Sequence, residues 1–437
     1  MRIPTIKHIN SNVLIGFGLI CFYVVLARNA DFSGQVMQPI LFYGFGFSLM
    51  VLGTILLNKK RVKIPVNRLF WLVTLIPFIY CAANILDFSL FVLGILLILL
   101  VQLEEDNNKV LYSIVTVVAV INAVCVFIQA IDHTFFLPFL RNILAPGMYE
   151  YYVKILGKSY FSGCNAIVGD TAGFLLNGIG IFICCIIARD AKKLKISAYI
   201  VMAILVGALL FTGKRSQLLC GLMVTILLYI LSGKSTKKFK RIAVSLLAVG
   251  AAYLLIDVLV SIFPSAYTIS RMLDSINGLL LGEDVSSGRS TLYRYAIEQF
   301  QSAPIFGIGW KEFNQLSTSL YNYSSTHYVN NDYLQILCET GLVGFICIFA
   351  PMFVFLHKSL KAFAVINNAP ELYAPETRMA ILYSLFIQLY YLMYLFLENP
   401  LYNRSFFFMY ILSVLIGYSA IRKCYIFANN NQRSHYT

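Results

Sequence analysis

Charged residues are scarce in this chain. They make up 12% of its 437 residues, whereas 59% are hydrophobic, and a soluble domain carries about a quarter charged residues. This shortage excludes a water-soluble globular protein. Apolar runs of about 17 to 24 residues recur along the chain instead, and each is long enough to cross a hydrocarbon core of roughly 30 Å. The sequence therefore predicts a polytopic membrane protein.

The apolar runs predict an all-α fold of about 12 transmembrane helices in one integral membrane domain, residues 1–437. The predicted spans are 11–28, 36–57, 66–85, 87–103, 110–132, 165–188, 196–213, 216–232, 242–263, 333–356, 377–397 and 404–421. Two outer connections, residues 133–164 and 264–332, are longer than the others. The second is the largest polar stretch of the chain, and we expect it to be a periplasmic loop that contains short helices and part of a site.

The chain has a formal net charge of +14, and its Lys and Arg residues are concentrated in alternate connections between the predicted spans. If both termini are cytoplasmic, most Lys and Arg residues fall in the inner connections, for example in residues 59–63, 192–195 and 234–241. This is the positive-inside pattern of membrane proteins. The basic charge therefore reports membrane topology, and it predicts no nucleic-acid partner.

Paired cysteines and metal-binding motifs are missing. The ten cysteines include no C-x-x-C pair, so neither a disulfide framework nor a zinc site is predicted. There is also no H-E-x-x-H, no G-x-S-x-G and no closely spaced D-x-D pair, so the sequence predicts no metal and no cofactor. Most cysteines lie inside predicted spans, where they behave as small hydrophobic residues: Cys21, Cys81, Cys125, Cys184, Cys185, Cys220 and Cys347.

Two arginines lie at predicted outer ends of the spans, against the positive-inside pattern. Arg215 stands in the tight turn of "LLFTGKRSQLL", and Arg289 stands in the first turn of a helix predicted from Ser287 to about Ser302. Either arginine could be a surface charge that reaches the lipid headgroups. The alternative is an anion site, because a helix start and a guanidinium group both bind phosphate. With no metal motif, this alternative favours a lipid-linked phosphate or pyrophosphate.

A third stretch, "THYVNNDYLQILCETGLVG" at residues 326–344, begins with polar residues and continues as a predicted span. Asn330, Asn331 and Asp332 lie at the predicted outer end of this span. Glu339 follows about two helical turns into the apolar part, where a carboxylate is either paired with a neighbour or functional. We therefore predict a site where the large outer loop meets this span.

The motifs "FTGKRSQLL", "SSGRSTLYRYAIEQFQSAPIFGIG" and "NNDYLQILCETGLVG" resemble, in this order, the O-antigen ligase and O-antigen polymerase superfamily of bacterial envelope enzymes. The resemblance is close over roughly residues 200–360. It implies metal-independent transfer of a glycan from undecaprenyl pyrophosphate to an acceptor hydroxyl, and it places the family's two donor-binding arginines at Arg215 and Arg289. Asn331, Gly341 and Gly344 keep the spacing of the ligase motif as supporting residues.

The chain departs from the ligase motif at Asn330, which stands where the ligases have a histidine. An asparagine side chain does not take up a proton near neutral pH, although it can orient a hydroxyl group. His327 and Asp332 are the nearest candidates for the base. Alternatively no strong base is needed, because cleavage of the bond to pyrophosphate runs ahead of attack. We predict catalytic roles for His327, Asn330 and Asp332, supported by Glu339.

The first expectation is a repeat-unit polymerase of the bacterial inner membrane that acts on O-antigen or a related polysaccharide at the periplasmic side. The resemblance implies an undecaprenyl-pyrophosphate-linked oligosaccharide as donor and a lipid-linked repeat unit or lipid A core as acceptor. Membrane lipids and a chain-length regulator are further partners. The alternatives are an O-antigen ligase, transfer to protein, and a flippase or carrier of lipid-linked glycan. Coupled carriers usually hold charges at mid-membrane, which these spans nearly lack.

Overall fold

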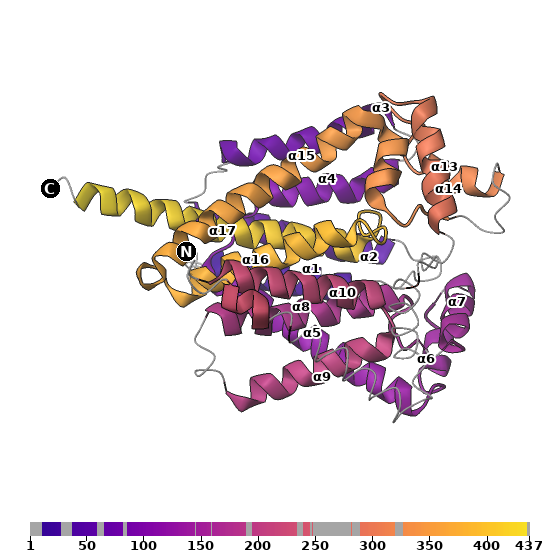
Figure 1. Ribbon diagram of the computed structural model, residues 1–437, viewed down its shortest axis with the longest axis horizontal. Helices are drawn as coiled ribbons and strands as arrows, with labels where there is room; N and C mark the ends of the chain where they lie inside the picture. Colours follow the sequence, from indigo (N-terminus) through magenta and orange to yellow (C-terminus); the bar gives the residue numbers. More distant parts are fainter. Residues whose placement is uncertain are drawn as a thin grey trace, which may run out of the picture.

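The computed structural model is helical in every element that it describes (Figure 1). It describes residues 11–27, 37–58, 65–81, 85–144, 146–158, 160–188, 195–233, 239–244, 247, 281, 289–319 and 327–434. Most of the predicted span 242–263, the N-cap Ser287 and much of the loop 264–332 therefore lie outside the described residues. Within these limits the all-α prediction is confirmed.

The long helices of the bundle are α1 (Ser11–Ala27), α2 (Met37–Leu57), α4 (Ile85–Leu100), α5 (Glu105–Ile131), α8 (Val168–Ala188), α9 (Ile196–Thr212), α10 (Arg215–Leu231), α15 (Asp332–Asn368), α16 (Pro375–Tyr394) and α17 (Arg404–Ser434). The shorter elements are η1 (Val66–Leu75), α3 (Ile76–Tyr80), α6 (Leu137–Arg141), α7 (Pro146–Leu156), α13 (Arg289–Ser302), α14 (Glu312–Ser319) and η4 (Pro370–Leu372).

Among the described residues, four helices are long and apolar enough to cross a membrane: Glu105–Ile131, Val168–Ala188, Asp332–Asn368 and Arg404–Cys424. Several shorter apolar helices accompany them, so the prediction of a multi-pass membrane protein is confirmed, whereas the count of twelve spans is not. One reason is that most of the predicted span 242–263 lies outside the described residues, and another is length. α9 and α10 have 17 residues each, which reach about 26 Å, slightly less than the roughly 30 Å of the hydrocarbon core.

Helices α16 and α17 form the centre of the bundle (Figure 1). They pack against each other, with α15 on one side and α8 on the other. In α17, 94% of the most apolar window is buried inside the protein, against 33% in α5. This difference shows that α17 lies at the centre of the bundle and that α5 lies at its periphery. The short helices α6, α7, α13 and α14 all lie at one end of the bundle, opposite the far end of α17 (Figure 1).

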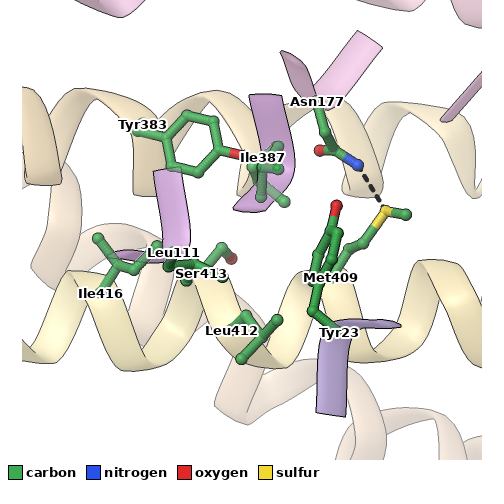
Figure 2. A pocket seen from close by; sticks show the side chains of 10 residues that line it. Tyr23, Leu111, Asn177, Tyr383, Ile387, Met409, Leu412, Ser413 and Ile416 are labelled. Atoms are coloured by element: carbon green, nitrogen blue, oxygen red, sulfur yellow. Dashed lines mark hydrogen bonds between the residues drawn. The ribbon is translucent and has the colours of Figure 1, made fainter. Parts of the chain in front are cut away.

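A small cavity lies between α1, α5, α8, α16 and α17 (Figure 2). Its volume is about 10 Å³, which is close to the minimum that one water molecule needs. Asn177 and Tyr23 present polar groups to it, and the Asn177 amide points to the sulfur of Met409. A sugar ring does not fit in this cavity, so the candidate site has to lie elsewhere.

Helix α15 is broken at Gly341, whose backbone angles are φ 63° and ψ −170°. In an unbroken helix the N–H groups of Leu342 and Val343 would bond to the carbonyl groups four residues before them. Residues 303–309, which we call the strap, pack against the break. They form the backbone hydrogen bonds that the helix lacks on both sides of Gly341. The N–H groups of Leu342 and Val343 donate to strap carbonyls at 2.9 and 3.2 Å.

The strap in turn donates two N–H groups to the carbonyls that the break leaves open. Ile308 N donates to Cys338 O at 3.0 Å, and Gly309 N donates to Glu339 O at 2.9 Å. This close approach of two backbones requires glycine. A Cβ on Gly307 would lie 2.3 Å from the carbonyl carbon of Glu339, and Gly307 has a φ of +73°. The strap therefore fixes the first two turns of α15, which carry Asp332 and Glu339.

Replacing Gly307 by Ala should lower the stability of the purified protein markedly. The positive φ alone costs about 1 to 3 kcal/mol for a residue with a side chain, and the new methyl group also collides with the backbone of α15. The measurement is the thermal unfolding midpoint in detergent. Gly147→Ala is the matched control, because a Cβ there meets no atom within 4 Å. Equal midpoints for the two variants would contradict this account of the strap.

Candidate functional site

The connector between α16 and α17, residues 395–403, lies at the same end of the bundle as α13 and α14 (Figure 1). Among the described helices, α8, α10, α13, α15 and α17 begin around it, and hydrogen bonds or ion pairs join it to the first four. Each helix start carries the positive end of the helix dipole. The connector therefore lies in a region that attracts negative charge.

Glu398 on the connector holds two cations from different helices. Its Oε1 atom lies 3.4 Å from Lys214 Nζ and 3.1 Å from Arg289 Nη2. Arg289 also donates through Nη1 to the carbonyl of Leu397. Burial raises the pKa of the Glu398 carboxyl, but the charges of Lys214 and Arg289 outweigh burial, so the pKa lies below its usual range. Glu398 is therefore an anion at neutral pH.

This ion cluster keeps a net positive charge, since two cations share one carboxylate. Arg215 follows Lys214 directly and is the first residue of α10, so it adds a third cation at the same helix start. The side chains of Lys214 and Arg289 are 31% and 30% exposed, whereas that of Glu398 is 18% exposed. The cations are thus the accessible part of the cluster.

The predicted residues Asn330, Asn331 and Asp332 lie against the connector. Asp332 is fully buried, and its two carboxylate oxygens accept hydrogen bonds from Asn399 Nδ2 at 2.8 Å and from Leu401 N at 2.6 Å. Asn331 caps α15, because its side chain accepts a hydrogen bond from the Leu334 N–H. Asp332 thus positions the connector, and both of its oxygens are already engaged.

Asn330 has a left-handed backbone, with φ at +56°, a conformation that asparagine tolerates better than most residues. Its N–H donates to Asn399 Oδ1 at 2.8 Å, and its carbonyl accepts from the Tyr293 hydroxyl at 3.4 Å. Tyr293 lies one turn after Arg289 on α13. Asn330 and the helix that carries Arg289 are therefore in direct contact.

His327 is half-buried and lies just before this cluster. Its backbone N–H donates to Ser317 Oγ at 2.9 Å, which ties it to α14. Of the two residues predicted as candidate bases, His327 is the one whose side chain is partly open to solvent, whereas Asp332 is enclosed. The roles predicted for both residues remain predictions.

Glu339 is fully buried and accepts three hydrogen bonds. They come from Gln335 Nε2 at 3.0 Å, from the Lys311 N–H at 2.9 Å and from the Tyr402 hydroxyl. The ring of Tyr402 stacks on Trp310, with centroids 4.8 Å apart. Of the two alternatives for Glu339, the structure favours a carboxylate paired with its neighbours. Through these bonds Glu339 links α15 to Lys311, which follows the strap, and to Tyr402 of the connector.

Gly344 completes the supporting residues. A Cβ at this position would lie 2.3 Å from the Thr340 side chain and 2.8 Å from the Tyr80 hydroxyl, which donates to the Thr340 carbonyl at 2.9 Å. The absence of a side chain thus lets Tyr80 reach a carbonyl beside the break at Gly341. Both glycines of the motif therefore serve the geometry of the broken helix.

The sequence reasoning missed the connector and Lys214. Lys214, Glu398, Asn399 and Tyr402 make most of the contacts that assemble the site. A signal was present in "ENPLYN", a polar turn with a carboxylate, a proline and two asparagines between two apolar spans. Such a turn was too short to stand out beside the large loop.

These features define a multi-pass helical membrane protein with an anion-attracting site at one end of its bundle. A family model described as O-antigen ligase matches residues 200–349, roughly a third of the chain. Over this segment the match confirms the resemblance to the O-antigen ligase and O-antigen polymerase superfamily. No curated protein matches the chain. The matched segment contains the two arginines and both glycines of the motif, and it ends before the connector.

Replacing Glu398 by Gln should destabilise the protein by about 1 to 2 kcal/mol, because Lys214 and Arg289 lose their shared counter-ion in a partly buried place. The measurement is the unfolding midpoint of the wild type and the variant in detergent. Glu298→Gln is the control, since its ion pair with Arg294 is exposed on both sides, and its midpoint should hardly change.

The difference between wild type and Glu398→Gln should depend on pH. The pKa of Glu398 is lower in the folded protein, so the carboxylate stabilises the fold fully above the unfolded pKa of about 4.3. This stabilisation is lost as the pH falls through the lower folded pKa. A difference that persists or grows at the acid end would contradict the assignment.

Proposed function

We propose that this protein is a polymerase of O-antigen or a related surface polysaccharide. It transfers a glycan from undecaprenyl pyrophosphate to the terminal sugar hydroxyl of another lipid-linked repeat unit. The observation that carries the proposal is the cluster of Lys214, Arg215 and Arg289 at helix starts, with a net positive charge and with Asn330 beside it. A pyrophosphate is the anion that such a cluster suits.

In the proposed mechanism, Arg215 and Arg289, helped by Lys214, hold the donor pyrophosphate. The acceptor hydroxyl attacks the anomeric carbon, and the bond from this carbon to the pyrophosphate oxygen breaks. The lipid pyrophosphate leaves with the bonding electron pair, and the cations stabilise the charge that grows on it. Asn330 orients the acceptor hydroxyl, whose proton passes to His327 or to solvent.

The proposed site faces the periplasm, and the protein lies in the bacterial inner membrane with both termini in the cytoplasm. Two observations support this orientation. The connector and the short helices lie at one end of the bundle, away from the far end of α17 (Figure 1), and the basic connections alternate along the sequence. A lipid-linked donor would reach the site from the outer leaflet.

The second candidate is an O-antigen ligase, which transfers the glycan to lipid A core. The description of the matching family model favours it. Asn330 favours the polymerase, because it stands where the ligases have a histidine. Deletion of the gene, read on a lipopolysaccharide gel, separates the two. Loss of a polymerase leaves core capped by a single repeat, whereas loss of a ligase leaves bare core and accumulated lipid-linked polymer.

The same deletion tests the non-enzyme alternative. Loss of a flippase would leave bare core together with single lipid-linked units on the cytoplasmic leaflet. Either this result or the ligase result would overturn the polymerase proposal.

Arg289→Ala should reduce chain growth by about 100-fold or more, the typical effect of removing a donor that stabilises a developing anion. Chain length is measured on gels of cells that carry the variant, with its amount in the membrane measured in parallel. Arg294→Ala, on the same helix but exposed, is the matched control and should leave chain length unchanged. Normal chain length in Arg289→Ala would refute the pyrophosphate role.

Chain growth in isolated membranes should continue after treatment with a chelator such as EDTA, because the proposed chemistry relies on protein cations. Among the described residues, no group of three or more His, Cys, Asp and Glu is placed to hold a metal ion. The measurement is incorporation of labelled repeat units before and after chelation. Loss of incorporation that added Mg²⁺ restores would contradict a metal-independent mechanism.

A further inference from the structure

Two cysteines that are far apart in the sequence meet near the end of α5. Cys125 lies on α5 and Cys164 lies in the segment between α7 and α8, 39 positions later, and their sulfur atoms are 3.3 Å apart. Both are half-buried free thiols. They border an apolar cluster that includes Phe136 and Tyr152. The sequence placed Cys125 in an apolar span and predicted no disulfide.

The backbone around Cys164 is held against α5 by contacts that do not involve sulfur. Asn122 and Gln129 lie on the same face of α5 as Cys125, about one turn before and after it. Asn165 Nδ2 donates to Asn122 Oδ1 at 2.6 Å, and Gly163 N donates to Gln129 Oε1 at 2.7 Å. The position of the two thiols is therefore fixed by their neighbours on both sides.

Two further observations show how closely the segment and α5 approach. A Cβ on Gly163, whose φ is +62°, would lie 2.8 Å from Cys125 Cβ. The Tyr152 hydroxyl donates to the Gly163 carbonyl at 2.9 Å and accepts from Gln129 Nε2 at 2.6 Å. The bond length of a disulfide is about 2.05 Å, so bond formation needs only a small movement of two side chains.

We propose that Cys125 and Cys164 form a disulfide bond in the mature protein. This proposal rests on the orientation in the proposed function, which places this end of the bundle in an oxidising compartment. Each thiol gives up its proton, and the pair gives up two electrons to the disulfide of a thiol–disulfide oxidoreductase. That oxidant is reduced to its dithiol form while the sulfur–sulfur bond forms here.

The bond would close a loop that contains α6 and α7 and would fix the chain just before α8. Gly169, five residues after Cys164, accepts a hydrogen bond from Gln217 at 2.7 Å, and Asp170 accepts one from Asn403 on the connector at 2.8 Å. Lys214 packs near Gly169, since a Cβ on that glycine would lie 3.7 Å from Lys214 Cε. The disulfide thus stabilises the segment that leads to the candidate site.

The test is peptide mass spectrometry of the full-length protein from membranes of cells quenched with acid. Free thiols are blocked with N-ethylmaleimide before digestion without reductant. A peptide pair linked through Cys125 and Cys164 should be found, and it should disappear after dithiothreitol treatment. Cys185→Ser, another half-buried cysteine, is the control and should keep the linked pair. Finding both thiols blocked by maleimide would overturn the proposal.

A second measurement gives the consequence of the bond. Dithiothreitol should lower the unfolding midpoint of the wild type by at least about 3 °C and should leave that of Cys164→Ser unchanged. An equal effect on both proteins, or none on the wild type, would speak against the bond.

The failure of this proposal is distinguishable from failure of the proposed function. If both thiols are free while cells still make long-chain polysaccharide and Arg289→Ala abolishes it, only the disulfide is refuted. If the thiols are free and react with maleimide only when the reagent can enter the cytoplasm, the orientation is wrong as well. Cys164→Ser should keep chain growth within about twofold of the wild type, because neither cysteine contacts the site.

Discussion

The polar groups of the connector between α16 and α17 are held by partners on the helices around it, several of them buried, and this constraint organises the site. A buried polar group without a partner costs about 1 to 3 kcal/mol. Asn399 meets the requirement by bonding to Asn330, Asp332 and Gln335 together. The start of α15 and the connector therefore hold each other in one arrangement. Truncating Asn399 would leave one carboxylate oxygen of Asp332 without its hydrogen bond, and the Leu401 N–H would remain on the other.

A second constraint is the mutual repulsion of cations at helix starts. A cation at the positive end of a helix dipole is disfavoured by a few tenths to about 1 kcal/mol, and Lys214 and Arg289 also repel each other. Glu398 offsets both effects while leaving the cluster positive. A site of this kind is prepared for an anionic ligand, because the cations are already held in place when the ligand arrives.

The break in α15 connects these two features to the rest of the fold. Because the strap takes over the hydrogen bonds that Gly341 interrupts, the first two turns of α15 can tilt away from the membrane part of the helix without loss of backbone pairing. Glu339 lies in these turns and binds Tyr402 of the connector. The strap, the broken helix and the connector thus form one rigid support for Asn330 and Arg289.

Hydrophobic run length and charge patterning by themselves determined that the chain is an all-helical membrane protein, because these properties act locally along the chain. The three motifs likewise identified Arg289, Asn330 and the glycines, which lie in recognisable segments. The partners of Glu339 and the meeting of Cys125 with Cys164 were decided only by the tertiary structure. So was the role of Glu398, whose neighbours Lys214 and Arg289 lie 184 and 109 positions away. Pairing across such separations depends on how whole helices pack, which no local pattern encodes.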